Sequence, residues 1–197
     1  MQMQSNSQAG QDAFAATVAR RTTYLDIGAG EPVRISNTKA LEDLGWTGIL
    51  CDIEHEARLR AERKAHAVYG DFFAHDWRAI LFDFARDGRI GYLSLDLEPP
   101  MLTLAALVRL PLDLIRFDCI TVEHDLYRGN PAIRSAMRGI LRDAGYELVA
   151  PNVCIGKGAA RAPFEDWWVD GGLTPAHLAA DVAAQIRSLL NEQEAEA

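Results

Sequence analysis

One short stretch, residues 24–30 with the sequence YLDIGAG, constrains the fold of this 197-residue chain more than any other. Its apolar half is typical of a buried parallel strand, and Asp26 stands near the end of that strand. Gly28, Ala29 and Gly30 follow as a turn, in which glycine lets the backbone bend sharply and approach a bound molecule closely. The stretch therefore predicts the first strand of an α/β sheet, with a ligand at its C-terminal end.

A second apolar strand that ends in an acid follows about twenty-five residues later. It closes with Asp52, and an acid in that position is suited to hydrogen-bond both hydroxyls of a ribose. A pyrophosphate fits the first turn poorly, because Asp26 and Glu31 would repel it by on the order of a few kcal/mol. Val33 also replaces the third glycine of the dinucleotide pattern. A cationic cofactor such as S-adenosylmethionine fits better, and an ordinary strand–turn–helix with a solvated acid is the alternative.

The composition is that of a single soluble globular domain, with 49% apolar residues, 24% charged residues and a net charge of −8. Because no basic run or basic helix face occurs, we expect no nucleic-acid partner. No apolar segment has the length of a bilayer span, so no membrane partner is expected either. Three cysteines in apolar runs (Cys51, Cys119 and Cys154) and the lack of a signal-peptide core predict a cytoplasmic protein with free thiols. A homo-oligomer remains open.

Alternating strand and helix patterns predict a Rossmann-like, doubly wound α/β sheet. The expected strands are residues 24–27, 48–52, 67–69, 90–96 and 117–123. The expected helices are residues 12–20, 39–44 after cap residues 36–38, 56–66, 76–86, 101–108 and 131–144, with a last helix over 175–190. Residues 146–155 and 164–169 predict an antiparallel hairpin that closes the mostly parallel sheet. We expect a disordered tail over 1–11, one domain over 12–190 and a frayed tail over 191–197.

Acids stand at four of the expected strand ends, which share one edge of an open α/β sheet. They are Asp26, Asp52, Asp96 with Glu98, and Glu123 with His124 and Asp125. Clustered carboxylates repel one another and raise one another's pKa values. A cation should therefore relieve them: a sulfonium, a substrate amine, an arginine or a divalent metal.

His124 is the histidine placed at the end of a core strand, where its near-neutral pKa suits a general base. A structural histidine bonded to a neighbouring loop is the alternative. Asp96, Glu123 and His124 could also hold Mg²⁺ or Mn²⁺, although we assign no metal ligand. Trp167 and Trp168 alternate on a strand, so either both pack in the core or one walls a substrate pocket.

Taken in order, several of these segments resemble the FkbM-like branch of class I S-adenosylmethionine-dependent methyltransferases. The shared segments are DIGA at 26–29, SNT at 36–38 with LE at 41–42, GWTGIL at 45–50, YLSLDLE at 92–98 and ITVEH at 120–124. The resemblance covers roughly residues 22–170. It implies the class I methyltransferase fold, a methyl donor held by the first two strand ends and transfer to a small molecule, usually to oxygen.

The resemblance also implies roles for single residues. The residues expected at the methyl donor are Asp26, Gly28, Ala29, Gly30, Asp52, Ile53, Asp71, Phe72 and Asp96. The expected catalytic residues are Asp96, Glu98 and His124. In this reading Asp52 holds the ribose, and Asp71 with Phe72 borders the adenine.

Two departures from the family pattern bear on function. Pro99 and Pro100 replace the usual glycine and stiffen the loop over the expected substrate site. The second strand ends in Asp52, Ile53 and Glu54, where the family commonly has Glu-Pro-Asn. A non-catalytic partner or scaffold with the same fold is therefore one alternative, and a nicotinamide-dependent oxidoreductase is another.

Overall fold

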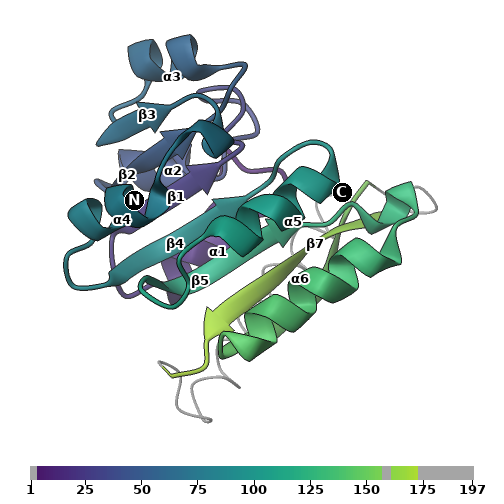
Figure 1. The fold of residues 1–197 in the computed structure, drawn as a ribbon. Coiled ribbons are helices and arrows are strands. Elements are labelled where there is room, and N and C mark those ends of the chain that lie inside the picture. Colours follow the sequence, from purple (N-terminus) through teal and green to yellow (C-terminus); the bar gives the residue numbers. More distant parts are fainter. Residues whose placement is uncertain (1–3, 157–160, 173–197) are drawn as a thin grey trace.

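The computed structural model describes residues 4–156 and 161–172, which form an α/β fold around one sheet (Figure 1). Its strands are β1 (Thr23–Ile27), β2 (Thr47–Cys51), β3 (Ala67–Tyr69), β4 (Arg89–Leu95), β5 (Arg116–Glu123), β6 (Tyr146–Ile155) and β7 (Ala162–Asp170). The helix expected over 175–190 and the tail expected over 191–197 lie outside the described residues.

The strand order in the seven-stranded sheet is β3-β2-β1-β4-β5-β7-β6. β1 runs parallel to both of its neighbours, so that Leu25 pairs with Ile49 on β2 and with Leu93 on β4. β7 joins β5 in the antiparallel direction, and β6 pairs with β7 at the edge. The structure therefore confirms a mostly parallel sheet with a C-terminal antiparallel hairpin. The order of strands reverses between β1 and β4, and ligands of open α/β sheets bind at such a switch point.

Helices cover both faces of the sheet. They are α1 (Gln11–Val18), α2 (Lys39–Asp43), α3 (Glu56–Glu62), α4 (Trp77–Phe84), α5 (Pro100–Arg109) and α6 (Pro131–Asp143), with the short 3₁₀ helices η1 (Phe72–Ala74) and η2 (Leu126–Arg128). Buried side chains of α4, α5 and α6 pack on one face, and those of α1, α2 and α3 pack on the other. Trp167 and Trp168 on β7 are both fully buried, one in each of these cores. Both tryptophans therefore contribute to the packing of the two cores.

The polar segment before α1 is held by a buried acid, which differs from the disordered tail that its composition predicts. Asp12 accepts hydrogen bonds from the hydroxyls of Ser5 and Ser7, each at 2.7 Å, and from the N–H of Asn6 at 2.8 Å. The N–H of Ser36 in turn donates to the carbonyl of Asn6 at 3.1 Å. Polar composition resembles that of a tail, but these residues are the donors that a buried carboxylate requires.

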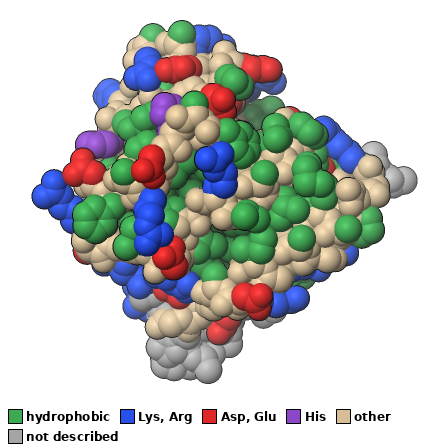
Figure 2. All heavy atoms as spheres, in the orientation of Figure 1, with side chains coloured by type: hydrophobic (Ala, Val, Ile, Leu, Met, Phe, Trp, Pro, Cys, Tyr) green, Lys and Arg blue, Asp and Glu red, His purple; other side chains and the backbone are tan. Residues whose placement is uncertain are grey.

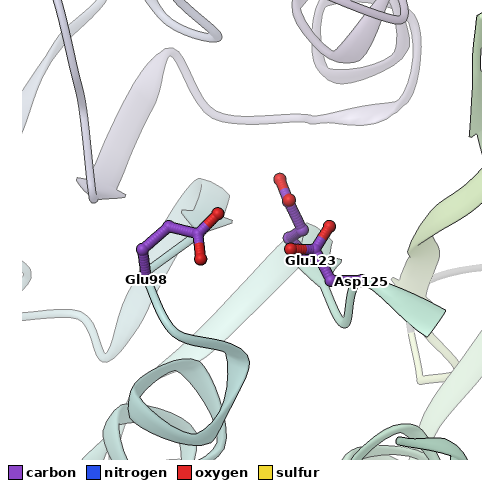
Figure 3. A group of neighbouring side chains, drawn as sticks. All are labelled: Glu98, Glu123 and Asp125. Carbon is purple, nitrogen blue, oxygen red and sulfur yellow. The ribbon is translucent and has the colours of Figure 1, made fainter. Parts of the chain in front are cut away.

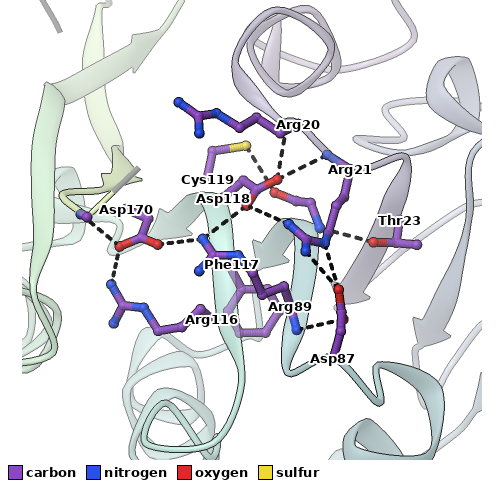
Figure 4. A network of polar contacts seen from close by, with 12 residues as sticks. Arg20, Arg21, Thr23, Asp87, Arg89, Arg116, Phe117, Asp118, Cys119 and Asp170 are labelled. Atoms are coloured by element: carbon purple, nitrogen blue, oxygen red, sulfur yellow. Dashed lines mark hydrogen bonds and ion pairs between the residues drawn. The ribbon is translucent and has the colours of Figure 1, made fainter. Parts of the chain in front are cut away.

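Ion pairs tie together the sheet edge that carries the amino ends of β1, β4 and β5 (Figure 4). Asp118 on β5 accepts hydrogen bonds from the N–H groups of Arg20 and Arg21, at 2.9 and 3.1 Å. Arg89 on β4 pairs with Asp170 on β7 at 2.7 Å and with Asp118 at 3.4 Å. Because β4, β5 and β7 are neighbours, these pairs join three strands and the segment that enters β1.

Figure 2 shows hydrophobic side chains gathered on the face that carries α5 and α6. On α5, Met101 is 52% exposed and Val108 is 64% exposed. Among the helices that the structure describes, none combines the length and the apolar character needed to cross a bilayer. Exposed apolar side chains are common on the surfaces of globular proteins, so these side chains alone assign no partner.

Candidate functional site

Two cavities open at the carboxyl ends of the parallel strands and share Gly28 and Asp96 as lining residues. The acidic cavity, of about 210 Å³, takes its name from Asp26, Glu31, Asp96 and Glu123. The apolar cavity, of about 320 Å³, takes its name from Ile53, Phe72, Phe73, Leu97 and Leu102. Together they form one trough across the switch point between β1 and β4.

The turn after β1 requires glycine at positions 28 and 30 for different physical reasons. Gly28 has φ +80°, and a Cβ there would lie 1.5 Å from the carbonyl oxygen of Asp96. Its N–H donates to the carbonyl of Cys51 at 2.8 Å. Gly30 has φ +62° and open space around it, while its N–H donates to Asp52 at 2.8 Å. The close approach expected at this turn is therefore to the backbone of β4, and it joins the two halves of the sheet edge.

Asp52 lines the apolar cavity and is joined to the turn after β1 by the N–H of Gly30, which lines the acidic cavity. One carboxylate oxygen accepts from the N–H groups of Glu54 and His55, at 2.9 and 2.7 Å, and lies 3.1 Å from the His55 ring nitrogen Nδ1. The other oxygen accepts from Gly30 and keeps acceptor capacity. Asp52 can thus bind one hydroxyl directly rather than bridge two. His55 also lines the apolar cavity and contacts Asp52 there.

Asp26 forms the buried floor of the acidic cavity, with 1% of its surface exposed. Burial raises the pKa of this carboxyl, while the Thr38 hydroxyl, which donates to it at 2.6 Å, and the charge of Arg63 lower it. Arg63 is itself buried, pairs with Glu42 at 3.1 Å and donates to Thr38 at 3.2 Å. The helix expected over 56–66 ends at Glu62, which lets Arg63 turn inward. This buried contact carries no signal in the sequence.

The apolar cavity contains Asp71 and Phe72, which are predicted to border an adenine, and Ile53, which is expected at the methyl donor. Asp71 accepts from the N–H of Phe73 at 2.8 Å through one oxygen, so its other oxygen is available. Phe72 is 3% exposed and stacks on Trp77 with ring centroids 4.9 Å apart. Ile53 is 70% exposed at the mouth of the cavity. An apolar side chain that is exposed beside an apolar cavity is suited to cover a flat ring.

Asp96 and Glu123 bring two carboxyl groups together in the acidic cavity. Burial raises the pKa of both, and the negative charge of Asp96 raises the pKa of Glu123 further. Like charges held this close cannot both ionise.

The position of His124 argues against the general-base role expected of it and against its place in the metal site considered above. Its side chain is fully buried, Nδ1 accepts from the N–H of Leu126 at 3.2 Å, and Nε2 lies 3.5 Å from Asp166. It lines neither cavity. Successive side chains at the end of a strand point to opposite sides, so Glu123 enters the cavity and His124 turns away. These contacts favour the alternative of a structural histidine.

Glu98 lies at the rim, where it lines the apolar cavity and pairs with Arg128 at 2.6 Å. Within the described residues, the carboxylates that could share a metal ion are Glu98, Glu123 and Asp125. This group shares Glu123 with the three residues considered from the sequence, but it contains Glu98 and Asp125 instead of Asp96 and His124.

No protein-family model matches this chain, and no curated protein matches it. Among solved structures, one similar chain is described as "Putative hemolysin from Streptococcus thermophilus". It shares 15% identity with a TM-score of 0.48, and the match covers 98% of this chain and 78% of the other. A likeness of that size supports no functional argument, so function must be inferred from the site itself.

Proposed function

We propose that this protein is an S-adenosylmethionine-dependent methyltransferase that acts on a small molecule, with oxygen as the expected methyl acceptor. The observation that carries the proposal is the trough, in which an apolar cavity lined by Asp52 and an acidic cavity join at Gly28 and Asp96. The apolar cavity suits the flat base at one end of such a ligand, and the acidic cavity suits the positive charge at its other end.

Each part of such a donor has a partner of suitable chemistry. In the apolar cavity, Ile53 and Phe73 would cover the adenine, and the available oxygen of Asp71 would accept from its amino group. Asp52 would accept from a ribose hydroxyl. The ammonium and sulfonium would lie in the acidic cavity, whose Asp26 and Asp96 supply negative charge. A phosphate in that cavity would be repelled, which argues against a dinucleotide.

The topology supports the same proposal. The order β3-β2-β1-β4-β5-β7-β6, with its antiparallel hairpin, resembles the layout of class I methyltransferases. The segments 26–29 and 92–98 that carry the FkbM-like resemblance lie at the ends of β1 and β4, on either side of the trough.

The bound donor would supply a methyl group activated by positive sulfur. The contribution of the protein is then alignment of acceptor and donor, plus removal of the acceptor proton. Asp96 is the residue placed for that removal, because it lines both cavities and burial raises its pKa above the usual range.

The test is calorimetric titration with S-adenosylmethionine and S-adenosylhomocysteine. Ile53→Ser should weaken binding at least about tenfold, since apolar contact with the adenine is lost. Val108→Ser is the matched control, because Val108 is similarly exposed (64%) but lies on α5 outside both cavities. Asp71→Asn should weaken binding by a similar factor. Absence of heat with both ligands, or equal affinity in Ile53→Ser and wild type, would refute the proposal. Binding without turnover over a panel of hydroxyl acceptors would favour the non-catalytic alternative.

A further inference from the structure

Three carboxylates from different positions along the chain converge at the rim of the trough (Figure 3). Glu98 follows β4, Glu123 ends β5 and Asp125 lies in the turn after it. Figure 3 shows Glu98 reaching toward the carboxyl groups of the other two. One oxygen from each lies within 4.8 Å of the others. Oxygens that share a cation at about 2.0–2.6 Å lie no more than about 5 Å apart, so the spacing fits a single ion.

Asp125 gives an independent reason to expect a cation. Its carboxylate is 1% exposed, yet neither oxygen receives a hydrogen bond from the described residues. The backbone holds it in place, because the N–H groups of His124 and Asp125 both donate to the carbonyl of Phe164, at 2.7 and 2.9 Å. Buried carboxylates without donors are unfavourable and are normally paired or bound to a metal.

Among the described residues, Arg128 is the cation that pairs with this group of carboxylates. Its Nε lies 2.9 Å from Asp125, as an ion pair without hydrogen-bond geometry, and its Nη1 donates to Glu98 at 2.6 Å. The Arg128 side chain is 49% exposed. It can therefore swing into solvent without uncovering the core.

We propose that Glu98, Glu123 and Asp125 form a divalent-cation site, and that Arg128 occupies it as an internal cation until a metal displaces the guanidinium. Three carboxylates are hard oxygen donors, which select Mg²⁺, Mn²⁺ or Ca²⁺ rather than a thiolate-binding metal. Solvent at the exposed Glu98 side supplies the remaining ligands. The site does not depend on the proposed methyl transfer, although the ion would lie next to Asp96.

If a metal ion displaces Arg128, substitutions of two exposed residues should change the affinity for the metal in opposite directions. In calorimetric titrations with Mn²⁺ and no methyl donor, Glu98→Gln should weaken binding at least tenfold, because one ligand charge is lost. Arg128→Gln should tighten binding at least threefold, because the competing cation is removed. Asp113→Asn and Arg78→Gln are the matched controls, since they form an exposed ion pair of 3.1 Å on another part of the surface.

Both outcomes are required. Equal Mn²⁺ affinity in Glu98→Gln and wild type, or no binding in either wild type or Arg128→Gln, would overturn the site. Weaker binding in Arg128→Gln would overturn the role of the arginine as a competitor. Substitution of the buried Asp125 can disturb the turn that contains it. The test therefore uses Glu98 and Arg128, whose side chains are both exposed. Circular dichroism of each variant checks that it is folded.

Discussion

Replacing Gly28 by alanine should damage this fold far more than replacing Gly30, although both glycines lie in the same turn. Both have positive φ, at +80° and +62°, a conformation that costs alanine about 1–2 kcal/mol. They differ in their surroundings. The Cβ of Gly28→Ala would lie 1.5 Å from the carbonyl oxygen of Asp96, whereas that of Gly30→Ala meets nothing within 4 Å.

The size of the difference follows from the contacts at the turn. Real Cβ contacts hardly occur below 3.0 Å, so the turn and the end of β4 must separate by about 1.5 Å. That movement breaks the hydrogen bond from the N–H of Asp96 to Ile27, at 2.9 Å, and the bond from Gly28 to Cys51, at 2.8 Å. A lost backbone hydrogen bond costs about 1 kcal/mol, and more when its groups stay buried. We therefore expect Gly28→Ala to lose about 2–4 kcal/mol more than Gly30→Ala.

Urea denaturation followed by tryptophan fluorescence gives the free energy of unfolding of both variants and of wild type. Gly30→Ala should remain folded, with a loss of about 1–2 kcal/mol from the positive φ alone. Gly28→Ala should show the larger loss or no cooperative transition, because total stability is only about 5–15 kcal/mol. Free energies that agree within about 0.5 kcal/mol would refute the reasoning, since the two variants differ in the clash.

Three other substitutions test the fold away from this turn. Gly139→Ala in α6 should raise the free energy of unfolding by about 0.5–1 kcal/mol, because its Cβ meets nothing within 4 Å and alanine favours helix; a lower melting temperature would contradict this. Arg63→Met should cost about 3–5 kcal/mol by leaving Glu42 buried without its partner, and adding Glu42→Gln should restore part of the loss. Additive losses in that double variant would mean that the two side chains act independently. Burial raises the pKa of Asp166, but the guanidinium of Arg138, at 2.7 Å, and further hydrogen bonds hold it below its usual value. This pair therefore stabilises the fold at neutral pH, and the stability should fall as pH drops below about 4. In Asp166→Asn the acid-dependent loss should be smaller, so an unchanged pH profile of the denaturation midpoint would exclude the pair as its source.

The order and type of the elements could be predicted because their signals are local. The segment 48–52 contains apolar side chains in a row, and β2 lies there; α6 begins at Pro131, which suits the first turn of a helix. The ends of the helices are predicted less accurately. The helix expected to run to residue 66 stops at Glu62, because Arg63 leaves it to pair with the buried Glu42. That contact joins residues far apart in the chain.

Part of the site was predictable for the same reason. Acids at the ends of parallel strands must meet at one edge, and Asp26, Asp52 and Asp96 do line the trough. His124 and Asp125 show the limit of the argument. Both follow β5 directly, yet His124 faces Asp166 inside the fold, and Asp125 turns toward Glu98 and Glu123.

The class of fold and the edge of the sheet that carries the acids can be predicted from the sequence, because hydrophobic periodicity and glycine turns act over a few residues. The fold is needed to know which acids face one another, which are buried and which cation balances them. Those properties depend on the direction of each side chain and on distances across strands. Arg128 illustrates this, because its place between Glu98 and Asp125 follows from the packing of two loops that meet only in the folded chain.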